Sequence, residues 1–290
     1  MLLLKRIVVV GSGVMGRGIA YAAAIAGFVT TVTDNQSSAL ASAEAEINQL
    51  VESGIQRGKL SEQVGAYALA NVAFTTSLNT AVMDADLIIE AVPEKPQLKQ
   101  AVFQLLEKVA KSSCIFATNT STMSPTEIAS YGARPAKTIA MHFFNPVHKM
   151  RLIEIVRGLE TSDETVESVK EVARRMGKET VVINEFPGFV TSRMSALVGN
   201  EAFFMLQEGL GTPEDIDKAI KLGLNYPMGP FELGDLVGLD TRLNNLRYLH
   251  EKLGEKYRPA PLLEQYVQAG RLGRKTGKGV YQYNEEEVTT

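Results

Sequence analysis

The feature that most constrains this 290-residue chain is a short apolar run followed at once by three closely spaced glycines. Residues 7–10 read Ile-Val-Val-Val, and Gly11-Ser-Gly13-Val-Met-Gly16 separates them from an alanine-rich helical stretch. In a strand, loop and helix of this order, Gly11 permits the tight turn, Gly13 lets the backbone approach a pyrophosphate, and Gly16 lets helix and strand pack closely. The N-terminus of the helix also attracts an anion. The pattern predicts a dinucleotide-binding βαβ unit.

The next β-branched run, residues 29–33, is followed by an acid that narrows the choice of dinucleotide. Asp34 lies 18 residues after Gly16. A carboxylate at this place accepts hydrogen bonds from the hydroxyls of an adenosine ribose and repels a 2′-phosphate. Asn35 beside it adds no positive charge. We therefore expect NAD rather than NADP, with FAD as the alternative that the glycine loop leaves open.

Strand-like and helix-like patterns alternate along the first two thirds of the chain. Short β-branched runs are separated by stretches in which apolar residues recur every three or four positions, which is typical of a parallel sheet covered on both faces. The expected strands are 7–10, 29–33, 71–75, 87–92, 114–118, 138–143, 152–156 and 180–184. The expected helices between them are 14–26, 36–56, 94–111 and 165–176.

After Pro187-Gly188 the pattern changes to helices alone. We expect them at residues 189–208, 213–222, 231–253 and 262–269. Thr212-Pro213-Glu214-Asp215 supplies an N-cap, a proline at the first helical position and acids in the first turn of one of them. The sequence therefore predicts a Rossmann-type, mostly parallel sheet domain at residues 1–185, followed by an all-helical C-terminal domain at residues 186–290.

Composition and charge narrow the class of protein. The net charge is −3 with both signs mixed along the chain, which gives no electrostatic footprint for nucleic acid or for an anionic membrane. No run of about 18 apolar residues, the length needed to span a bilayer, occurs. The single cysteine, Cys114, cannot form an internal disulfide and is compatible with a reducing compartment. We expect a cytoplasmic protein without a metal site.

A histidine and a glutamate in consecutive apolar runs are the candidate chemistry. His142 lies near the end of one run, and Glu154 lies inside the next. Neighbouring strands place such residues side by side, and an imidazole held by a carboxylate can take a proton near neutral pH. The other histidines, His148 in a polar turn and His250 in a charged helical stretch, have no acid in an adjacent apolar run. The alternative for His142 is a buried structural pair.

A serine follows the fifth expected strand. Asn119-Thr-Ser121 begins where that strand ends, and ligands gather at the carboxyl ends of the strands in open α/β sheets. His142 closes the sixth expected strand, so both side chains are expected at this edge. Ser121 is therefore either a ligand contact or a cap for the helix that begins after it.

These segments resemble the (S)-3-hydroxyacyl-CoA dehydrogenase family, and the resemblance covers nearly the whole chain in order. It rests on Asn119-Thr-Ser121, Met141-His-Phe-Phe-Asn-Pro146, Glu154, Pro187-Gly-Phe189, Tyr226-Pro-Met-Gly-Pro-Phe-Glu232 and Gly273-Arg-Lys-Thr-Gly277. The resemblance implies a Rossmann-type NAD domain and a helical domain that contributes to substrate binding and forms a homodimer. It also implies reversible oxidation of a 3-hydroxyacyl-CoA to the 3-oxoacyl-CoA, in the breakdown of fatty acids, butanoate or phenylacetate.

The resemblance implies a role for each matching side chain. His142 takes the proton of the 3-hydroxyl group as hydride leaves C3 for NAD, Glu154 holds the imidazole, and Ser121 hydrogen-bonds the reacting oxygen. The implied cofactor contacts beyond the glycine loop and Asp34 are Glu94, Lys99, Asn145 and Lys275. Ordinary solvated surface charge is the alternative for the charged members of that set.

Two basic residues after the long second helix are candidates for the substrate. Arg57 and Lys59 flank Gly58 and are placed to meet the phosphates of CoA, although the glycine also marks an ordinary loop. The run Phe203-Phe204-Met205-Leu206 is a candidate for the dimer interface, with a buried core as the equally simple alternative.

One position departs from the family pattern. The first C-terminal helix contains Thr191-Ser192-Arg193, where the family has an asparagine before the arginine. That asparagine helps to position substrate and cofactor in the family. Ser192 keeps a hydroxyl group but has a shorter reach and lacks the paired donor and acceptor of an amide. The departure bears on rate and acyl preference rather than on the type of reaction.

Two other functions are compatible with the sequence. A dehydrogenase of the same fold can act on a hydroxy acid that carries no CoA. A protein that binds NAD without catalysis is the second alternative, and Ser192 is its only support in the sequence. A panel of acyl-CoA substrates and free hydroxy acids separates all three.

Overall fold

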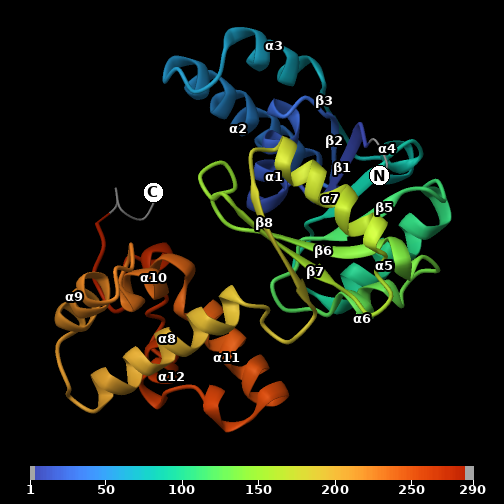
Figure 1. The fold of residues 1–290 in the computed structure, drawn as a ribbon. Helices are drawn as coiled ribbons and strands as arrows, with labels where there is room; N and C mark the ends of the chain where they lie inside the picture. Colours follow the sequence, from blue (N-terminus) through green and yellow to red (C-terminus); the bar gives the residue numbers. More distant parts are fainter. Residues whose placement is uncertain (1–3, 285–290) are drawn as a thin grey trace. The chain divides into compact units, whose positions relative to one another are not determined.

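The computed structural model describes residues 4–284, which form two compact units that meet in the chain between Phe186 and Pro187 (Figure 1). The first unit contains one eight-stranded sheet with the order β3-β2-β1-β4-β5-β6-β7-β8. The strands are β1 (Arg6–Val10), β2 (Val29–Thr33), β3 (Val72–Thr75), β4 (Leu87–Glu90), β5 (Ile115–Thr118), β6 (Thr138–Phe143), β7 (Leu152–Arg157) and β8 (Glu179–Asn184).

The sheet is mostly parallel, as the sequence predicts. All neighbours from β3 across to β6 are parallel, β7 is antiparallel to β6, and β8 is parallel to β7. A parallel connection needs a crossover of about a dozen residues or more. The segment 144–151 is too short for one, so the chain turns back and β7 runs in the opposite direction.

Helices cover both faces of the sheet (Figure 1). On β1, Ile7 and Val9 belong to one apolar cluster, while Val8 and Val10 belong to another. The first cluster includes side chains of α1 (Val14–Ile25), α2 (Ser37–Gln56) and α7 (Asp163–Arg175). The second includes side chains of α4 (Leu78–Val82), α5 (Pro96–Val109) and α6 (Pro125–Ala129). Burial on both faces explains why these strands read as continuous apolar runs.

The second unit is built from helices. They are α8 (Thr191–Gln207), α9 (Pro213–Gly223), α10 (Pro230–Val237), α11 (Leu239–Leu253) and α12 (Pro261–Gln268). The ring of Phe203 is 1% exposed and packs edge-on against Phe231 and Tyr266. The three residues that follow Phe203 pack against the same core. This run is therefore part of the core of its own unit, which favours the core alternative over the dimer interface.

Several predicted boundaries differ from the observed ones. The single helix expected at 231–253 is two helices, because Gly238 between α10 and α11 has a φ of 102° that no helix contains. Two helices were missed, α3 (Glu62–Ala70) and the five-residue α4, while the helix expected after Ser121 is the short α6, which begins at Pro125. Strand β4 ends at Glu90 and α5 begins at Pro96, so Glu94 lies in the loop between them. No helix within residues 4–284 is both long and apolar enough to cross a membrane.

Candidate active site

The loops that follow the parallel strands lie at one edge of the sheet. Because β1 to β6 are parallel, their carboxyl ends point the same way. The candidate residues at this edge are the glycine loop after β1, Asp34 after β2, Glu94 after β4, Ser121 after β5, and His142 and Asn145 at the end of β6. The topology therefore places cofactor candidates and chemical candidates on the same edge.

The three glycines of the loop meet different surroundings. Gly11 has a φ of 101°, and a side chain there would lie 2.8 Å from the carbonyl oxygen of Ala91. A Cβ on Gly16 would lie 1.8 Å from the carbonyl oxygen of Gly11, so α1 packs on the loop at a distance that only glycine allows. A Cβ on Gly13 would meet no protein atom within 4 Å. Protein packing explains Gly11 and Gly16, whereas Gly13 leaves open space for a ligand.

A pocket of about 690 Å³ extends over this loop. Its lining includes Gly11, Gly13, Asp34, Ala91 and Val92. The volume lies in the range of typical small-molecule sites, and the first turn of α1 opens directly onto it. The open space at Gly13 and the acid in the same lining fit an adenine dinucleotide.

The carboxylate of Asp34 is held firmly in its ionised form. It accepts hydrogen bonds from the backbone N–H and the hydroxyl of Ser12, at 2.8 and 2.9 Å, and from the backbone N–H of Gln36 at 3.0 Å. Burial by itself would raise the pKa of Asp34, but these hydrogen bonds outweigh it and bring the pKa below its usual range. A fixed negative charge at this place suits NAD, whose adenosine ribose has free hydroxyls.

His142 and Glu154 form a buried pair across two antiparallel strands. They are directly opposite each other in the β6–β7 register, and Nδ1 of His142 lies 2.8 Å from Oε2 of Glu154. His142 is 8% exposed and Glu154 is fully buried. The side-chain oxygen of Asn119 accepts a hydrogen bond from the backbone N–H of Phe143 at 3.0 Å, which ties the end of β5 to the end of β6. The imidazole therefore has a fixed orientation at the cofactor edge.

The loop around Ser121 is held on both sides. The hydroxyl of Thr120 donates a hydrogen bond to Glu94 and accepts one from the backbone N–H of Met123 at 2.9 Å. The cap of α6 is Ser124, whose hydroxyl accepts from the backbone N–H of Glu127 at 3.1 Å. The alternative that Ser121 caps this helix is therefore wrong, and its side chain lies half-buried in an anchored loop.

Lys99 is not an ordinary surface lysine. Its side chain is fully buried, and Nζ lies 2.9 Å from both carboxylate oxygens of Glu90 and 3.1 Å from Glu94. Glu90 also accepts hydrogen bonds from the hydroxyl of Thr118 at 2.6 Å and from the backbone N–H of Val92 at 2.8 Å. The alternative of a solvated charge is wrong for Lys99. Its ammonium group bridges two carboxylates beneath the loop that carries Glu94.

Glu90 and Thr118, the last residues of β4 and β5, were missed in the sequence analysis. A signal for Glu90 was present, because it is an acid that closes the apolar run Leu-Ile-Ile, just as Glu154 is an acid within an apolar run. Thr118 gave no such signal, since threonine is common in strands for reasons of packing alone.

The remaining candidates lie elsewhere on the two units. Arg57 and Lys59 are exposed at the end of α2, on either side of Gly58, whose φ of 66° confirms the turn. Ser192 is in the first turn of α8, and Nζ of Lys275 binds the carboxylate of Asp240 at 2.6 and 2.7 Å. Within residues 4–284, no three or more His, Cys, Asp or Glu side chains form a group that could hold a metal ion.

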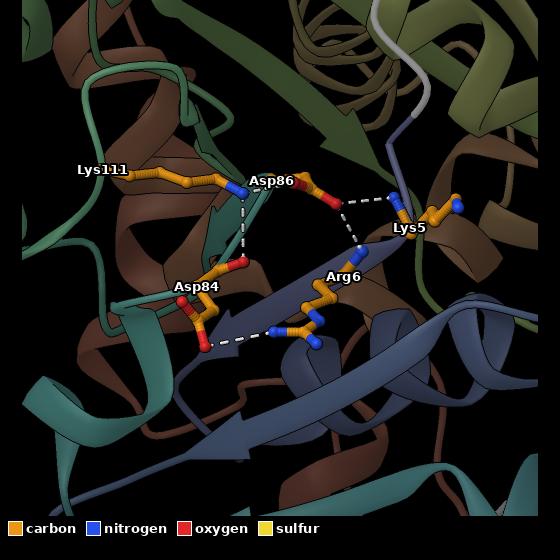
Figure 2. Close-up of a pocket in the computed structure, with 5 residues that line it drawn as sticks. All are labelled: Lys5, Arg6, Asp84, Asp86 and Lys111. Atoms are coloured by element: carbon orange, nitrogen blue, oxygen red, sulfur yellow. Dashed lines mark hydrogen bonds and ion pairs between the residues drawn. The ribbon is translucent and has the colours of Figure 1, made fainter.

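A second, charged pocket lies at the opposite edge of the sheet, where the strands begin (Figure 2). Asp86 accepts hydrogen bonds there from the backbone N–H groups of Lys5 and Arg6 and from Nζ of Lys111. Arg6 pairs with Asp84 at 3.1 Å. These charges satisfy one another and tie the starts of β1 and β4 together, so this pocket is not the cofactor site.

The class of protein follows from these groups. Three features define an NAD-dependent dehydrogenase: a Rossmann-type sheet, a glycine loop with an acid at the end of the neighbouring strand, and a histidine held by a carboxylate at the same edge.

Comparison with known proteins gives the family. Residues 6–186 match the NAD binding domain of 3-hydroxyacyl-CoA dehydrogenase, and residues 188–283 match its C-terminal domain. The chain belongs to the 3-hydroxyacyl-CoA dehydrogenase family, and its activity is the NAD-dependent interconversion of 3-hydroxyacyl-CoA and 3-oxoacyl-CoA.

Full-length relatives agree with this assignment. A probable 3-hydroxybutyryl-CoA dehydrogenase of Bacillus subtilis is 42% identical over 98% of this chain and 99% of its own length. One of Deinococcus radiodurans is 44% identical over 95% and 99%. The crystal structure of (S)-3-hydroxybutyryl-CoA dehydrogenase from Ralstonia eutropha has a TM-score of 0.94 at 40% identity and covers 97% of this chain and 100% of its own.

The second and third glycines of the fingerprint should respond differently to the same substitution. Gly16→Ala puts a methyl group 1.8 Å from a backbone oxygen, so we expect it to lower the free energy of unfolding by about 1–3 kcal/mol. Gly13→Ala meets no protein atom and should leave stability unchanged while it weakens NAD binding at least about tenfold. Urea unfolding and calorimetric titration with NAD measure the two effects. Equal destabilisation by both substitutions would contradict this account.

The ionised state of Asp34 predicts how cofactor binding depends on pH. Because its pKa lies below the ordinary value, the carboxylate stays charged at every pH well above about 4. Affinity for ADP-ribose, which carries the adenosine ribose without the nicotinamide, should therefore stay constant from about pH 5 to pH 8. Asp34→Asn should lower that affinity about tenfold at each pH. A midpoint near pH 6 in the wild type would show that the carboxylate is not held in this way.

Proposed function

We propose that this chain oxidises short 3-hydroxyacyl-CoA thioesters, with 3-hydroxybutyryl-CoA as the representative substrate. The observation that carries the proposal is the His142–Glu154 pair at the edge of the sheet that binds the cofactor. The names of the relatives from Bacillus subtilis and Deinococcus radiodurans support the choice of a short acyl chain. The cytoplasmic location stays a prediction.

His142 acts as the general base. With Glu154 accepting at Nδ1, the proton of the neutral imidazole lies on Nδ1, and Nε2 carries the lone pair that takes the proton of the 3-hydroxyl group. Glu154 then stabilises the imidazolium, which forms where little water screens the pair. Help of this kind accelerates a reaction by roughly a hundredfold to ten-thousandfold. Bound NAD supplies the acceptor for the hydride from C3.

The other candidate residues bind and orient. Ser121 holds the reacting oxygen, since its loop is anchored at Thr120 and Ser124. Arg57 and Lys59 contact the phosphates of CoA. Glu94, Asn145 and Lys275 contact the cofactor, together with the three glycines of the loop and Asp34. Lys99 has no exposed surface, so its contribution to cofactor binding passes through Glu94.

The second unit contributes to substrate binding and forms a homodimer. The run that begins at Phe203 packs in the core of this unit, so we do not assign it to the dimer interface. Large apolar side chains remain exposed on the same unit, and they are Leu210, Leu222, Leu224, Leu236 and Val237. A surface of this kind suits a contact with a second copy of the chain.

Replacing the base tests the proposal. His142→Ala should reduce the turnover of 3-hydroxybutyryl-CoA by at least about a hundredfold, with NAD affinity within about twofold of the wild type. His250→Ala is the matched control, because His250 also pairs with a glutamate, at 3.1 Å, but on the surface of the second unit. NADH absorbance follows turnover, and undiminished activity in His142→Ala would sink the proposal.

The substrate class is tested in the same assay. Acetoacetyl-CoA is reduced with NADH, free hydroxy acids are oxidised with NAD⁺, and the rates are compared at equal substrate concentration. Turnover confined to the thioesters supports the proposal. Faster turnover of a free hydroxy acid would instead assign the chain to a non-CoA substrate, and stoichiometric NADH binding without turnover on any compound would show that catalysis has been lost.

Ser192 gives a prediction about acyl preference. Ser192→Asn restores the longer amide with its paired donor and acceptor, so we expect turnover of short substrates to rise about twofold to tenfold. The ratio kcat/KM for four-carbon and longer acyl-CoAs measures the effect. A clear fall would show that the serine is matched to the natural substrate of this enzyme.

A further inference from the structure

A buried cluster of three charges lies at the carboxyl ends of β4 and β5. It consists of Glu90 and Lys99, whose side chains are fully buried, and Glu94, whose side chain is 37% exposed. Thr118 and Thr120 each donate a hydroxyl hydrogen bond to one of the carboxylates. The groups therefore form one connected network that opens to solvent only through Glu94.

We infer that both acids carry a negative charge, because the ammonium group of Lys99 contacts each carboxylate. Every bond to Glu90 comes from a donor: the ammonium of Lys99 at both oxygens, the hydroxyl of Thr118 and the backbone N–H of Val92. The ammonium group and the backbone N–H can only donate, and together they supply three of the four hydrogen bonds to Glu90. Two carboxylates and one ammonium leave the cluster with a net charge of −1.

Stability alone does not explain such a cluster. Removing a lysine and a glutamate from water costs several kcal/mol for each ion, and well-packed apolar residues of similar size often serve a fold equally well. A charge kept in a dry place acts strongly on other charges nearby, because little solvent screens it. Because the cluster lies at the edge of the sheet where the cofactor is expected, the charge it would act on is that of the cofactor.

The order of the strands sets the direction of the cofactor. Asp34 follows β2 and the glycine loop follows β1, and the next strands across the sheet are β4, β5 and β6. A dinucleotide with its adenosine ribose at Asp34 and its pyrophosphate at the loop extends toward the ends of β4 and β5. The nicotinamide half therefore lies over this cluster, on the way to His142 at the end of β6. This step rests on the proposed cofactor contact of Glu94.

We propose that the Glu90–Lys99–Glu94 cluster selects the oxidation state of the cofactor. The nicotinamide ring is positively charged in NAD⁺ and neutral in NADH, so a net negative charge beside it stabilises NAD⁺ more than NADH. Glu90 is then a specificity-determining residue that does not touch the cofactor. Its negative charge neutralises the positive charge of Lys99, so that Lys99 does not neutralise the negative charge of Glu94.

Variants that change the net charge of the cluster test the proposal. Glu90→Gln brings it to zero, and the ratio of the Kd for NADH to the Kd for NAD⁺ should fall about tenfold. Glu90→Gln combined with Lys99→Met removes both members of the buried pair and restores −1, so the ratio should return to within about twofold of the wild type. Calorimetry gives the Kd for NAD⁺ and NADH fluorescence gives the other, both without substrate.

Two further variants keep the test independent of folding. Glu94→Gln removes the same charge from a partly exposed side chain, and the ratio should fall here too. Glu107→Gln is the matched control, because Glu107 lies on α5, the helix of Lys99, and also pairs with a cation, Arg134, at 2.9 Å, but away from the ends of β4 and β5. It should leave the ratio unchanged.

The outcomes separate charge selection from structural support. Equal weakening of NAD⁺ and NADH by Glu90→Gln, or a double variant that behaves like the single one, would overturn the proposal. Loss of turnover in His142→Ala says nothing about this ratio, so the two proposals fail independently. A wild-type chain that binds neither form would overturn the cofactor site itself.

Discussion

The parallel ladder from β3 to β6, with its single reversal at β7, is the constraint on which the rest of the site depends. Because the first six strands share one direction, every loop that follows them reaches the same edge. Because β7 runs back along β6, a residue of β7 lies directly opposite His142, and that residue is Glu154. Parallel pairing thus brings the candidate cofactor residues to one edge, and one antiparallel pairing supplies His142 with its carboxylate.

Close packing of α1 on β1 keeps that edge open for a ligand. The absence of a Cβ at Gly16 lets the helix approach the loop, and the positive φ of Gly11 turns the chain beneath Ala91. Together they aim the first turn of α1 at the space above Gly13. The same loop holds Asp34 through the backbone and hydroxyl of Ser12. One short segment therefore shapes the space expected for the pyrophosphate and also positions the acid expected at the adenosine ribose.

Much of this arrangement could be predicted, for reasons that particular residues show. Strands buried on both faces appear in the sequence as continuous apolar runs. The glycine loop is recognisable by the spacing of its glycines, and His142 and Glu154 are recognisable as polar residues in consecutive apolar runs. Lys99 could not be placed, because a helical pattern does not tell whether one lysine near the apolar stripe points inward. Its burial depends on Glu90, which lies nine positions earlier on another element. The break at Gly238 was missed because the helical pattern continues on both sides of it.

The two buried carboxylates at this edge differ in what their partners do during the reaction. Glu154 holds an imidazole that would gain and lose a proton in the proposed reaction, so its charge would be needed most when His142 becomes an imidazolium. Glu90 holds an ammonium group that also contacts Glu94, and proton transfer at His142 leaves that pairing unchanged. Glu154 would therefore stabilise a positive charge that forms only during the reaction, whereas Glu90 pairs with a positive charge that is always present on Lys99. In the proposed reaction the substrate gives a proton to His142 and a hydride to NAD⁺, so positive charge appears on the imidazole and is lost from the nicotinamide ring.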